Sequence, residues 1–250
     1  MPRPVITLTS DFGEGSPYVA AMKARLLAGC PDATLVDVGH AVPPFDVVAG
    51  AFVLWAGTRH FERGAVHLAV VDPGVGGARR PVAVDVAGAR FVGPDNGLFG
   101  LVLSEAGAGT RVAAVELPRP PEASPTFEGR DVFAPAAAAL AAGAPLESLG
   151  APLGSRLTPL PVAGPAVLWV DRFGNLVTNL RPPVRGLLVN GRAVRATART
   201  FGEAQPDTPF VYVGSMGFVE IGVRQGRADE RLDARPGTPV RPLEPPGRPP

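Results

Sequence analysis

The sequence predicts an α/β protein with a mainly parallel N-terminal sheet that has helices on both faces, followed by a smaller C-terminal all-β domain, either a sandwich or a barrel. In residues 1–160, short apolar runs alternate with helical patterns, which is typical of parallel sheets. In residues 161–233, only short β runs with Gly-containing turns follow one another. The chain has 250 residues, 46% of them hydrophobic, which is enough for a large and a small domain. Residues 234–250 are expected to form a Pro-rich flexible tail.

Apolar periodicity places the elements of the first domain. We expect strands at residues 5–9, 34–38, 65–71, 82–86 and 112–116. We expect helices at residues 18–28, 46–55, 95–104 and 134–142. Gly29 and Pro31 are typical residues after a helix end, and Asp46 favours a helix start.

The second domain contains β runs separated by turns. They lie at residues 166–170, 176–179, 187–189, 192–198, 210–213 and 218–223. Asn190-Gly191 is a strong signal for a two-residue hairpin. A Gly- and Pro-rich segment at residues 146–165 is expected to connect the domains.

Composition excludes several classes of protein. The net charge of +1 gives no electrostatic basis for binding nucleic acid or an anionic membrane surface. The single cysteine, Cys30, cannot form an intrachain disulfide. No signal-peptide pattern and no apolar run of membrane-spanning length occurs, so we expect a cytoplasmic protein. The three histidines do not have metal-ligand spacing, and Gly74-x-Gly76 lacks the rest of a dinucleotide fingerprint.

The segment AVHLAVVDPGVGGARR, residues 65–80, carries the strongest chemical signal. It reads as a buried strand that ends at Asp72, because Pro73 cannot donate to a sheet ladder. A glycine-rich turn then brings Arg79 within reach of the carboxylate. Open α/β sheets build ligand sites at such strand ends, although a capped strand with a surface ion pair fits the pattern equally well.

Three other segments end strands with polar residues in the same way. They carry Asp11, the pair Asp95 and Asn96, and the pair Asp171 and Asn175. Polar groups at the tips of rigid strands are what a preformed small-molecule site requires.

Seven segments form an ordered set over both domains. They are TLTSDFG (7–13), PPFD (43–46), DPGVGGARR (72–80), GPDNG (93–97), TFEGRDVFAP (126–135), DRFGNLVTN (171–179) and GSMGFVEIGV (214–223). This set resembles the S-adenosyl-L-methionine (SAM) hydroxide adenosyltransferases, also called adenosine-forming SAM hydrolases, which are relatives of fluorinating and chlorinating SAM enzymes. The resemblance implies an α/β domain, a C-terminal β-barrel and a homotrimer. It also implies that SAM lies between the N-terminal domain of one subunit and the C-terminal domain of its neighbour.

The resemblance implies hydrolysis of SAM to adenosine and methionine by an activated water or hydroxide that attacks C5′ of the ribose. SAM is then the substrate, and no cofactor or metal is needed. Asp72 and Arg79 match two of the three residues that hold this water in related hydrolases. The third position is Glu128, where the family usually has His.

Glu128 leaves alternatives open. A second carboxylate near Asp72 requires either that Arg79 neutralises the cluster or that one carboxyl pKa rises, in which case Glu128 could act as a general base. Glu128 could also be an exposed turn residue without a role. The alternative functions are a non-catalytic SAM- or adenosine-binding protein of the same fold, or adenosyl transfer to another small anion such as chloride.

Further residues match substrate contacts of the family. Asp11 matches the carboxylate that accepts both ribose hydroxyls, although it could instead cap the following helix. Phe45 matches an aromatic wall, although ordinary core packing is a second interpretation.

In the second domain, the resemblance assigns Asp171 to the methionine ammonium, and Phe173 and Asn175 to the adenine. It assigns Ser215 to the methionine carboxylate. The backbone of Arg227 and Ala228 matches a segment that meets the adenine edge.

Overall fold

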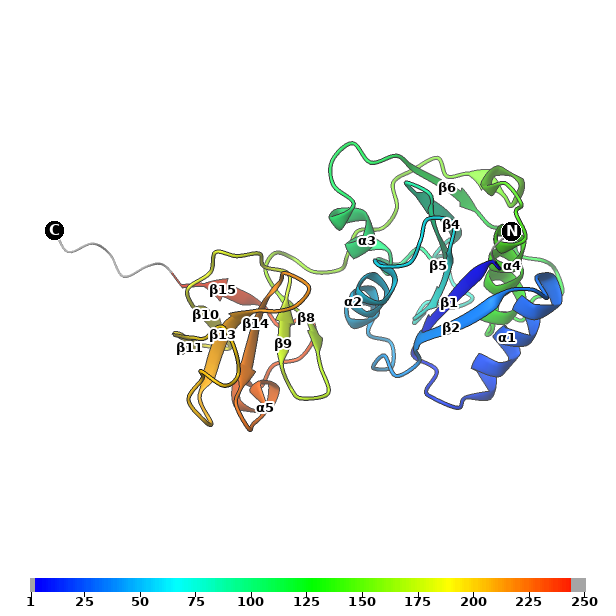
Figure 1. Ribbon diagram of the computed structural model, residues 1–250. Helices are drawn as coiled ribbons and strands as arrows, with labels where there is room; N and C mark the ends of the chain where they lie inside the picture. Colours follow the sequence, from blue (N-terminus) through cyan, green and yellow to red (C-terminus); the bar gives the residue numbers. More distant parts are fainter. Residues whose placement is uncertain (1–2, 244–250) are drawn as a thin grey trace. The chain divides into compact units, whose positions relative to one another are not determined.

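The computed structural model describes residues 3–243 of the chain (Figure 1). The chain divides into two compact units between Pro161 and Val162.

The first unit is built on one seven-stranded sheet in the order β2-β1-β3-β5-β4-β6-β7. The strands are β1 (Val5–Ser10), β2 (Thr34–Gly39), β3 (Val66–Val70), β4 (Pro81–Val86), β5 (Ala89–Pro94), β6 (Val112–Glu116) and β7 (Ala151–Pro152). Strands β2, β1, β3 and β5 pair in parallel, whereas β5, β4, β6 and β7 pair antiparallel.

The prediction of a mainly parallel sheet is therefore wrong for the half that contains β4, β6 and β7. The reason is the two-residue turn between β4 and β5. Ala87 and Gly88 have φ angles of +51° and +93°. Two successive positive φ angles match the twist of a tight hairpin, which reverses the chain where the sequence suggested a crossover.

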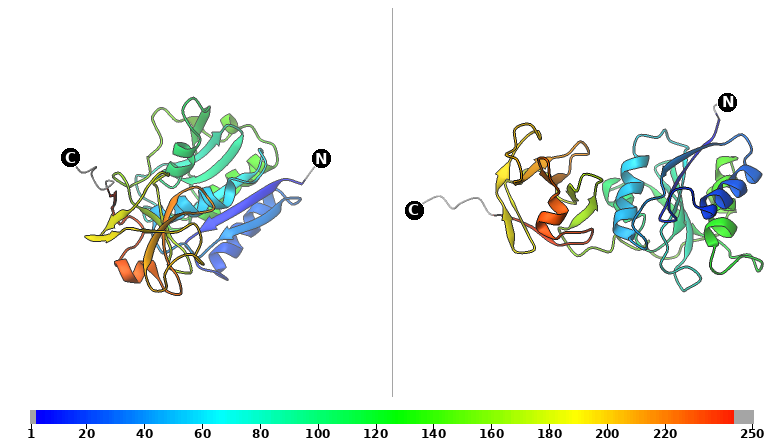
Figure 2. Two further views of the ribbon diagram at one scale, coloured as in Figure 1. Left: turned by 60° about the vertical axis from the view of Figure 1, so that its left-hand side comes forward. Right: turned by 90° about the horizontal axis from the view of Figure 1, so that it is seen from below.

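Helices lie on both faces of this sheet (Figures 1 and 2). α1 (Pro17–Gly29) and α4 (Ala134–Ala141) lie together on one face. α2 (Val47–Thr58) and α3 (Gly100–Glu105) lie on the other. Ile6 and Leu8 of β1 and Met22 of α1 are fully buried in the core beneath α1 and α4.

Local side-chain caps explain where these helices begin. The Ser16 hydroxyl accepts a hydrogen bond from the Tyr18 N–H at 3.3 Å, and Asp46 Oδ1 accepts one from the Ala49 N–H at 2.9 Å. α3 starts five residues after the predicted position, because Asn96 folds residues 95–99 into a turn. A π turn (Gly129–Phe133) leads into α4, and a 3₁₀ turn (Leu146–Ser148) precedes β7.

The second unit contains two sheets. A five-stranded sheet has the order β12-β13-β14-β9-β8, and a three-stranded sheet has the order β11-β10-β15. The elements are β8 (Val167–Val170), β9 (Leu176–Thr178), β10 (Leu187–Val189), β11 (Arg192–Val194), β12 (Ala196–Thr197), β13 (Pro209–Val213), β14 (Val219–Val223), α5 (Ala228–Leu232) and β15 (Val240–Pro242). The hydrogen bonds thus form two separate sheets, and the barrel that the resemblance implies is not confirmed.

Two local predictions in this unit have opposite outcomes. The Asn190-Gly191 hairpin is confirmed, because both residues have positive φ and join β10 to β11. The prediction of a flexible tail from residue 234 is wrong for residues 240–242, because they form β15, which pairs antiparallel with β10. Val240 is only 5% exposed and completes the apolar core of the unit, which explains why this segment is ordered. Residues 244–250 of the predicted tail lie outside the described residues.

His67 is a buried titratable group in the first unit. It lies on β3 with 2% exposure, and its Nδ1 shares a hydrogen bond of 2.9 Å with the Thr7 hydroxyl. The rings of Phe61 and Phe91 lie 5.9 and 4.9 Å from the imidazole. Burial lowers the pKa of His67 to about 4 because it disfavours the imidazolium. His67 is therefore a core histidine whose Nδ1 has a hydrogen-bond partner.

The stability of the protein should therefore fall between about pH 6.5 and about pH 4. In this window the unfolded chain binds a proton at His67 that the folded chain does not bind, so acid favours unfolding. The lowered pKa of His67 corresponds to a change of roughly 3 kcal/mol in the free energy of unfolding, at about 1.4 kcal/mol per pKa unit. Urea unfolding of wild type and His67→Gln at pH 7 and pH 4.5 measures the effect. The variant should lose less stability over this interval, and an equal loss would contradict the assignment.

Candidate active site

A hollow of about 310 Å³ opens at the carboxyl ends of β1 and β3. Its lining residues are Asp11, Phe12, Tyr18, Pro44, Phe45, Val70, Asp72, Val75, Thr126, Phe127, Glu128 and Gly129. The position follows from the parallel half of the sheet, where neighbouring strands end at the same edge. The volume and the mixture of aromatic walls with carboxylates are typical of a small-molecule site.

Asp72, Arg79 and Glu128 form one hydrogen-bonded centre beside this hollow. Arg79 Nε donates to Asp72 Oδ1 and Oδ2 at 3.0 and 2.9 Å, and Arg79 Nη2 also donates to Asp72. Arg79 Nη1 donates to Glu128 Oε2 at 2.5 Å. The side chains of Asp72 and Arg79 are 4% and 9% exposed, so the alternative of a surface ion pair is wrong.

Glu128 is buried to 2% exposure, which excludes an exposed turn carboxylate. It lies immediately before the π turn Gly129–Phe133. Such turns are frequent at functional sites because they re-aim side chains at a helix start. Its second oxygen, Oε1, accepts a hydrogen bond of 2.8 Å from Arg119 Nε. No sequence motif points to Arg119, which lies in a proline-rich loop outside the matched segments.

The loop that carries Arg79 depends on Gly76. Gly76 has a φ of +73°, and a Cβ atom there would lie 2.5 Å from the Pro125 carbonyl oxygen. Only glycine allows this close approach between the loop after Asp72 and the proline-rich loop.

The charges of this centre support one another. Burial by itself would lower the pKa of Arg79, but the hydrogen bonds and charges of Asp72 and Glu128 outweigh it and hold the pKa above its ordinary value. Arg79 therefore stays a cation between two carboxylates. Arg79 offsets one of the two negative charges, and Arg119, bonded to Glu128, offsets the other. This geometry favours the interpretation in which arginine neutralises the cluster.

Asp11 and Phe45 form another part of the wall of the hollow. Asp11 Oδ2 accepts a hydrogen bond of 2.8 Å from the Phe45 N–H. The cap of α1 is Ser16, so the alternative role of Asp11 as that cap is wrong. Phe45 is 70% exposed and has a φ of +66°, which excludes ordinary core packing. A positive φ in a bulky residue is strained and occurs mainly at functional positions.

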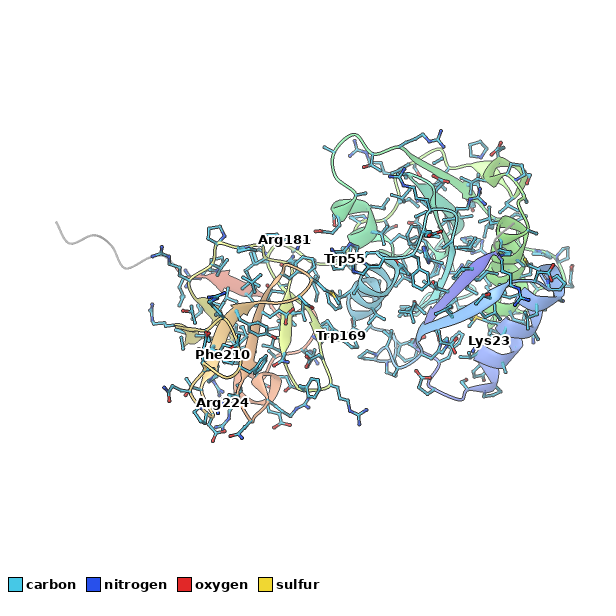
Figure 3. All side chains as sticks on the ribbon, viewed as in Figure 1. Lys23, Trp55, Trp169, Arg181, Phe210 and Arg224 are labelled. Atoms are coloured by element: carbon cyan, nitrogen blue, oxygen red, sulfur yellow. The ribbon has the colours of Figure 1, made fainter. Side chains whose placement is uncertain are left out.

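A buried histidine holds the loop that carries Asp11. Ser10 Oγ and His40 Nδ1 share a hydrogen bond of 2.7 Å, and the Gly13 N–H donates to the His40 carbonyl oxygen at 2.8 Å. His40 Nε2 lies 3.1 Å from Asp37. Asp37 also binds Lys23, the residue of α1 that is labelled in Figure 3, at 2.6 Å. The spacing of the histidines gives no sign of this role of His40, which depends on β1 and β2 being neighbours in the sheet.

The second unit brings Asp171, Phe173 and Asn175 together in one tight turn. Asp171 Oδ1 accepts from the Phe173 and Asn175 N–H groups at 2.8 and 2.9 Å, and Oδ2 accepts from Asn175 Nδ2 at 2.8 Å. Phe173 is 74% exposed and Asn175 is 6% exposed. The turn thus presents an aromatic ring to solvent and holds an amide in a fixed orientation.

Arg227 and Ala228 lie against this turn. The Ala228 N–H donates to the Gly174 carbonyl oxygen at 3.1 Å, and the Arg227 guanidinium donates to the Arg172 carbonyl oxygen at 3.0 Å. Ala228 is fully buried, and its N–H already donates to the Gly174 carbonyl oxygen. This N–H group is therefore not available to a ligand.

Ser215 lies in the turn at residues 214–217, and within residues 3–243 no side-chain hydrogen bond joins it to the Asp171 turn. No sequence motif points to a half-buried polar pair on β13 and β14, the strands on either side of the turn at residues 214–217. Tyr212 donates its hydroxyl to Glu220 Oε2 at 2.5 Å, and burial, together with the charge of Asp171, raises the pKa of Glu220.

The first unit carries a carboxylate–guanidinium centre beside a hollow, and the second unit carries a turn with an exposed aromatic ring and a fixed amide. These features are typical of a ligand-binding enzyme. Two family descriptions match the chain: the SAM hydroxide adenosyltransferase N-terminal domain at residues 6–150 and the C-terminal domain at residues 165–241. The chain belongs to the SAM hydroxide adenosyltransferase family, as the motifs predicted.

Named relatives agree with this assignment. An (R)-S-adenosyl-L-methionine hydrolase of Thermus thermophilus is 47% identical, over 96% of this chain and 99% of the relative. One of Salinispora arenicola is 42% identical, over 95% and 97% of the two chains. A fluorinase of Actinoplanes is 30% identical, over 87% and 90%.

Solved structures share the fold. A conserved hypothetical protein of Thermus thermophilus has a TM-score of 0.82 and 46% identity, over 97% of this chain and 100% of that one. An uncharacterized conserved protein of Thermotoga maritima also has a TM-score of 0.82, at 32% identity, over 94% and 98%. Within residues 3–243, no helix is long and apolar enough to cross a membrane.

Replacing His40 by alanine should loosen the loop that carries Asp11. Ser10 Oγ loses its buried partner, and a lost buried hydrogen bond costs about 1–3 kcal/mol. Amide hydrogen exchange in a peptide covering residues 10–14, followed by mass spectrometry, should speed up by about tenfold or more. His60→Ala, which removes an exposed histidine, is the matched control. Unchanged exchange in His40→Ala would show that the imidazole does not hold this loop.

Proposed function

We propose that the protein hydrolyses SAM to adenosine and L-methionine. The observation that carries this proposal is the buried Asp72–Arg79–Glu128 centre at the edge of a hollow, in a chain that belongs to the SAM hydroxide adenosyltransferase family. Asp72 and Asp11 follow the neighbouring parallel strands β3 and β1 and line the same hollow, so a ribose and a water can occupy neighbouring positions.

The reaction joins a water oxygen to C5′ of the ribose and breaks the bond from C5′ to sulfur. The electron pair of that bond goes to sulfur, so the sulfonium leaves as neutral methionine and needs no acid. The water loses one proton to a carboxylate of the centre. Because SAM itself supplies the leaving group, the reaction needs no cofactor.

The difficulty of this reaction is the nucleophile. Water must lie in line with the bond that breaks, with few other waters around it. Asp72 and Glu128 supply acceptor oxygens at the hollow, and Arg79 lies behind them and keeps both carboxylates in place. In this proposal Glu128 takes the position of the family's histidine as an acceptor for the proton of the water.

Substrate binding is assigned to both units. In the first unit, the Asp11 carboxylate accepts one hydrogen bond from the Phe45 N–H, and its remaining lone pairs accept hydrogen bonds from the ribose hydroxyls. The exposed Phe45 ring forms an apolar wall beside the ribose.

In the second unit, Phe173 stacks on the adenine and Asn175 bonds its edge, while Asp171 binds the methionine ammonium. Ser215 binds the methionine carboxylate. The backbone at Arg227 and Ala228 also approaches the adenine. The Ala228 N–H is excluded from this contact, because it already donates to the Gly174 carbonyl oxygen.

We propose further that the protein is a homotrimer whose sites combine the first unit of one subunit with the second unit of its neighbour. The exposure of the Phe45 and Phe173 rings, 70% and 74%, supports this, because both assigned walls of the substrate are uncovered apolar surface.

Asp72→Asn should lower kcat by at least about a hundredfold, since it removes a charged acceptor from the centre. SAM affinity should change little. The measurement is chromatography of adenosine and methionine after incubation with SAM. Asp32→Asn, which changes an exposed aspartate, should behave as wild type.

One result would contradict the proposed role of Asp72, and two others would contradict the hydrolysis itself. Full activity of Asp72→Asn would remove the centre from the reaction. SAM binding without adenosine would indicate a binding protein, and a halogenated nucleoside formed in chloride would indicate another nucleophile.

Mixing two inactive variants tests whether sites are shared. Asp72→Asn and Asn175→Ala, expressed together, should recover about a quarter of wild-type activity, because random assembly pairs the two intact units at one site in four. Sedimentation should give a mass about three times the 25.8 kDa of the chain. Sites contained within one chain would give no recovery, and a monomeric mass would rule out the trimer.

A further inference from the structure

Arg119 reaches the catalytic centre from outside the segments that define it. It lies in the loop after β6, between Pro118 and Pro120. Its Nε donates to Glu128 Oε1 at 2.8 Å, and its Nη2 donates to the main-chain carbonyl oxygen of Arg79 at 2.7 Å. One guanidinium therefore holds both the carboxylate at position 128 and the backbone that carries Arg79.

The charge of the centre is incomplete without Arg119. Asp72, Arg79 and Glu128 alone sum to one negative charge, and Glu128 is only 2% exposed. A buried carboxylate that shares its cation with another carboxylate is unfavourable unless a further partner is present. With Arg119 the centre contains two carboxylates and two guanidiniums, and its charge sums to zero.

The direction of the bonds matters more than the charge itself. The Arg119 side chain is 37% exposed, so water screens its charge. Its bond to Oε1 leaves Oε2 of Glu128 directed at Arg79 Nη1. The prolines on both sides fix φ at their own positions, so the loop offers few other conformations to this arginine.

We propose that Arg119 is a positioning residue: it holds Glu128 and the Arg79 main chain so that the Arg79 guanidinium stays between the two carboxylates. The proposal builds on the proposed SAM hydrolysis. Arg119 does not line the hollow, so its loss should lower kcat with little change in SAM affinity. Its effect should also depend on the negative charge of Glu128. A lysine should replace it poorly, because two differently directed bonds need the planar guanidinium.

A double-mutant cycle tests this proposal. Wild type, Arg119→Ala, Glu128→Gln and the double variant are compared in adenosine formation, SAM binding by calorimetry and urea unfolding. Arg119→Ala should lower kcat at least tenfold while the Kd for SAM changes less than threefold. In the Glu128→Gln background the same change should cost less than twofold. Arg119→Lys should recover only a minor part of kcat, and Arg111→Ala, an exposed arginine before β6, should match wild type.

The outcomes separate this inference from the function on which it rests. Wild-type kcat in Arg119→Ala, or the same fold-loss in both backgrounds, would overturn the positioning role even though hydrolysis is present. If wild type forms no adenosine, the hydrolase proposal fails, and the cycle is then evaluated from urea unfolding alone. If the losses of unfolding free energy from the two substitutions are not additive, the contact between Arg119 and Glu128 is supported. Additive losses overturn it.

Discussion

The arrangement of the site depends on one buried cation, the guanidinium of Arg79. Asp72 at the end of a strand and Glu128 before a π turn come from distant parts of the chain, and each would be costly to bury without it. The forked geometry of arginine lets one side chain bind both carboxylates from different nitrogens. The loop after β3 and the π turn are consequently fixed relative to one another by this group, and Arg119 joins the proline-rich loop to both.

The sheet explains why the chemistry gathers at one edge. β1 and β3 run in parallel, so Asp11 and Asp72 emerge at the same end. The antiparallel strands β4, β6 and β7 extend the sheet beyond this half and contribute no residue to the lining of the hollow. His40 adds a second support from β2, which steadies the loop after β1.

Sequence reasoning succeeded where the determinants are local or belong to a motif. The Asp72–Arg79 pair lies within one short loop, and the Asn190-Gly191 hairpin is set by two residues. It failed where neither a motif nor a turn signal marks the position. Arg119 lies only nine residues before Glu128, but it stands outside the matched motifs, and the reversal at Ala87 carries no strong turn signal because alanine rarely adopts positive φ. Periodicity likewise cannot reveal strand direction, so the mixed sheet was out of reach.

The contact between Asp11 and Phe45 limits how substitutions at Asp11 can be interpreted. The carboxylate restrains a phenylalanine whose left-handed backbone costs of order 1–3 kcal/mol. Truncating Asp11 would therefore remove an acceptor and also release the aromatic wall, and the two losses would enter a single measured number. An alanine scan would assign to the ribose hydroxyls an energy that belongs partly to the protein's own conformation.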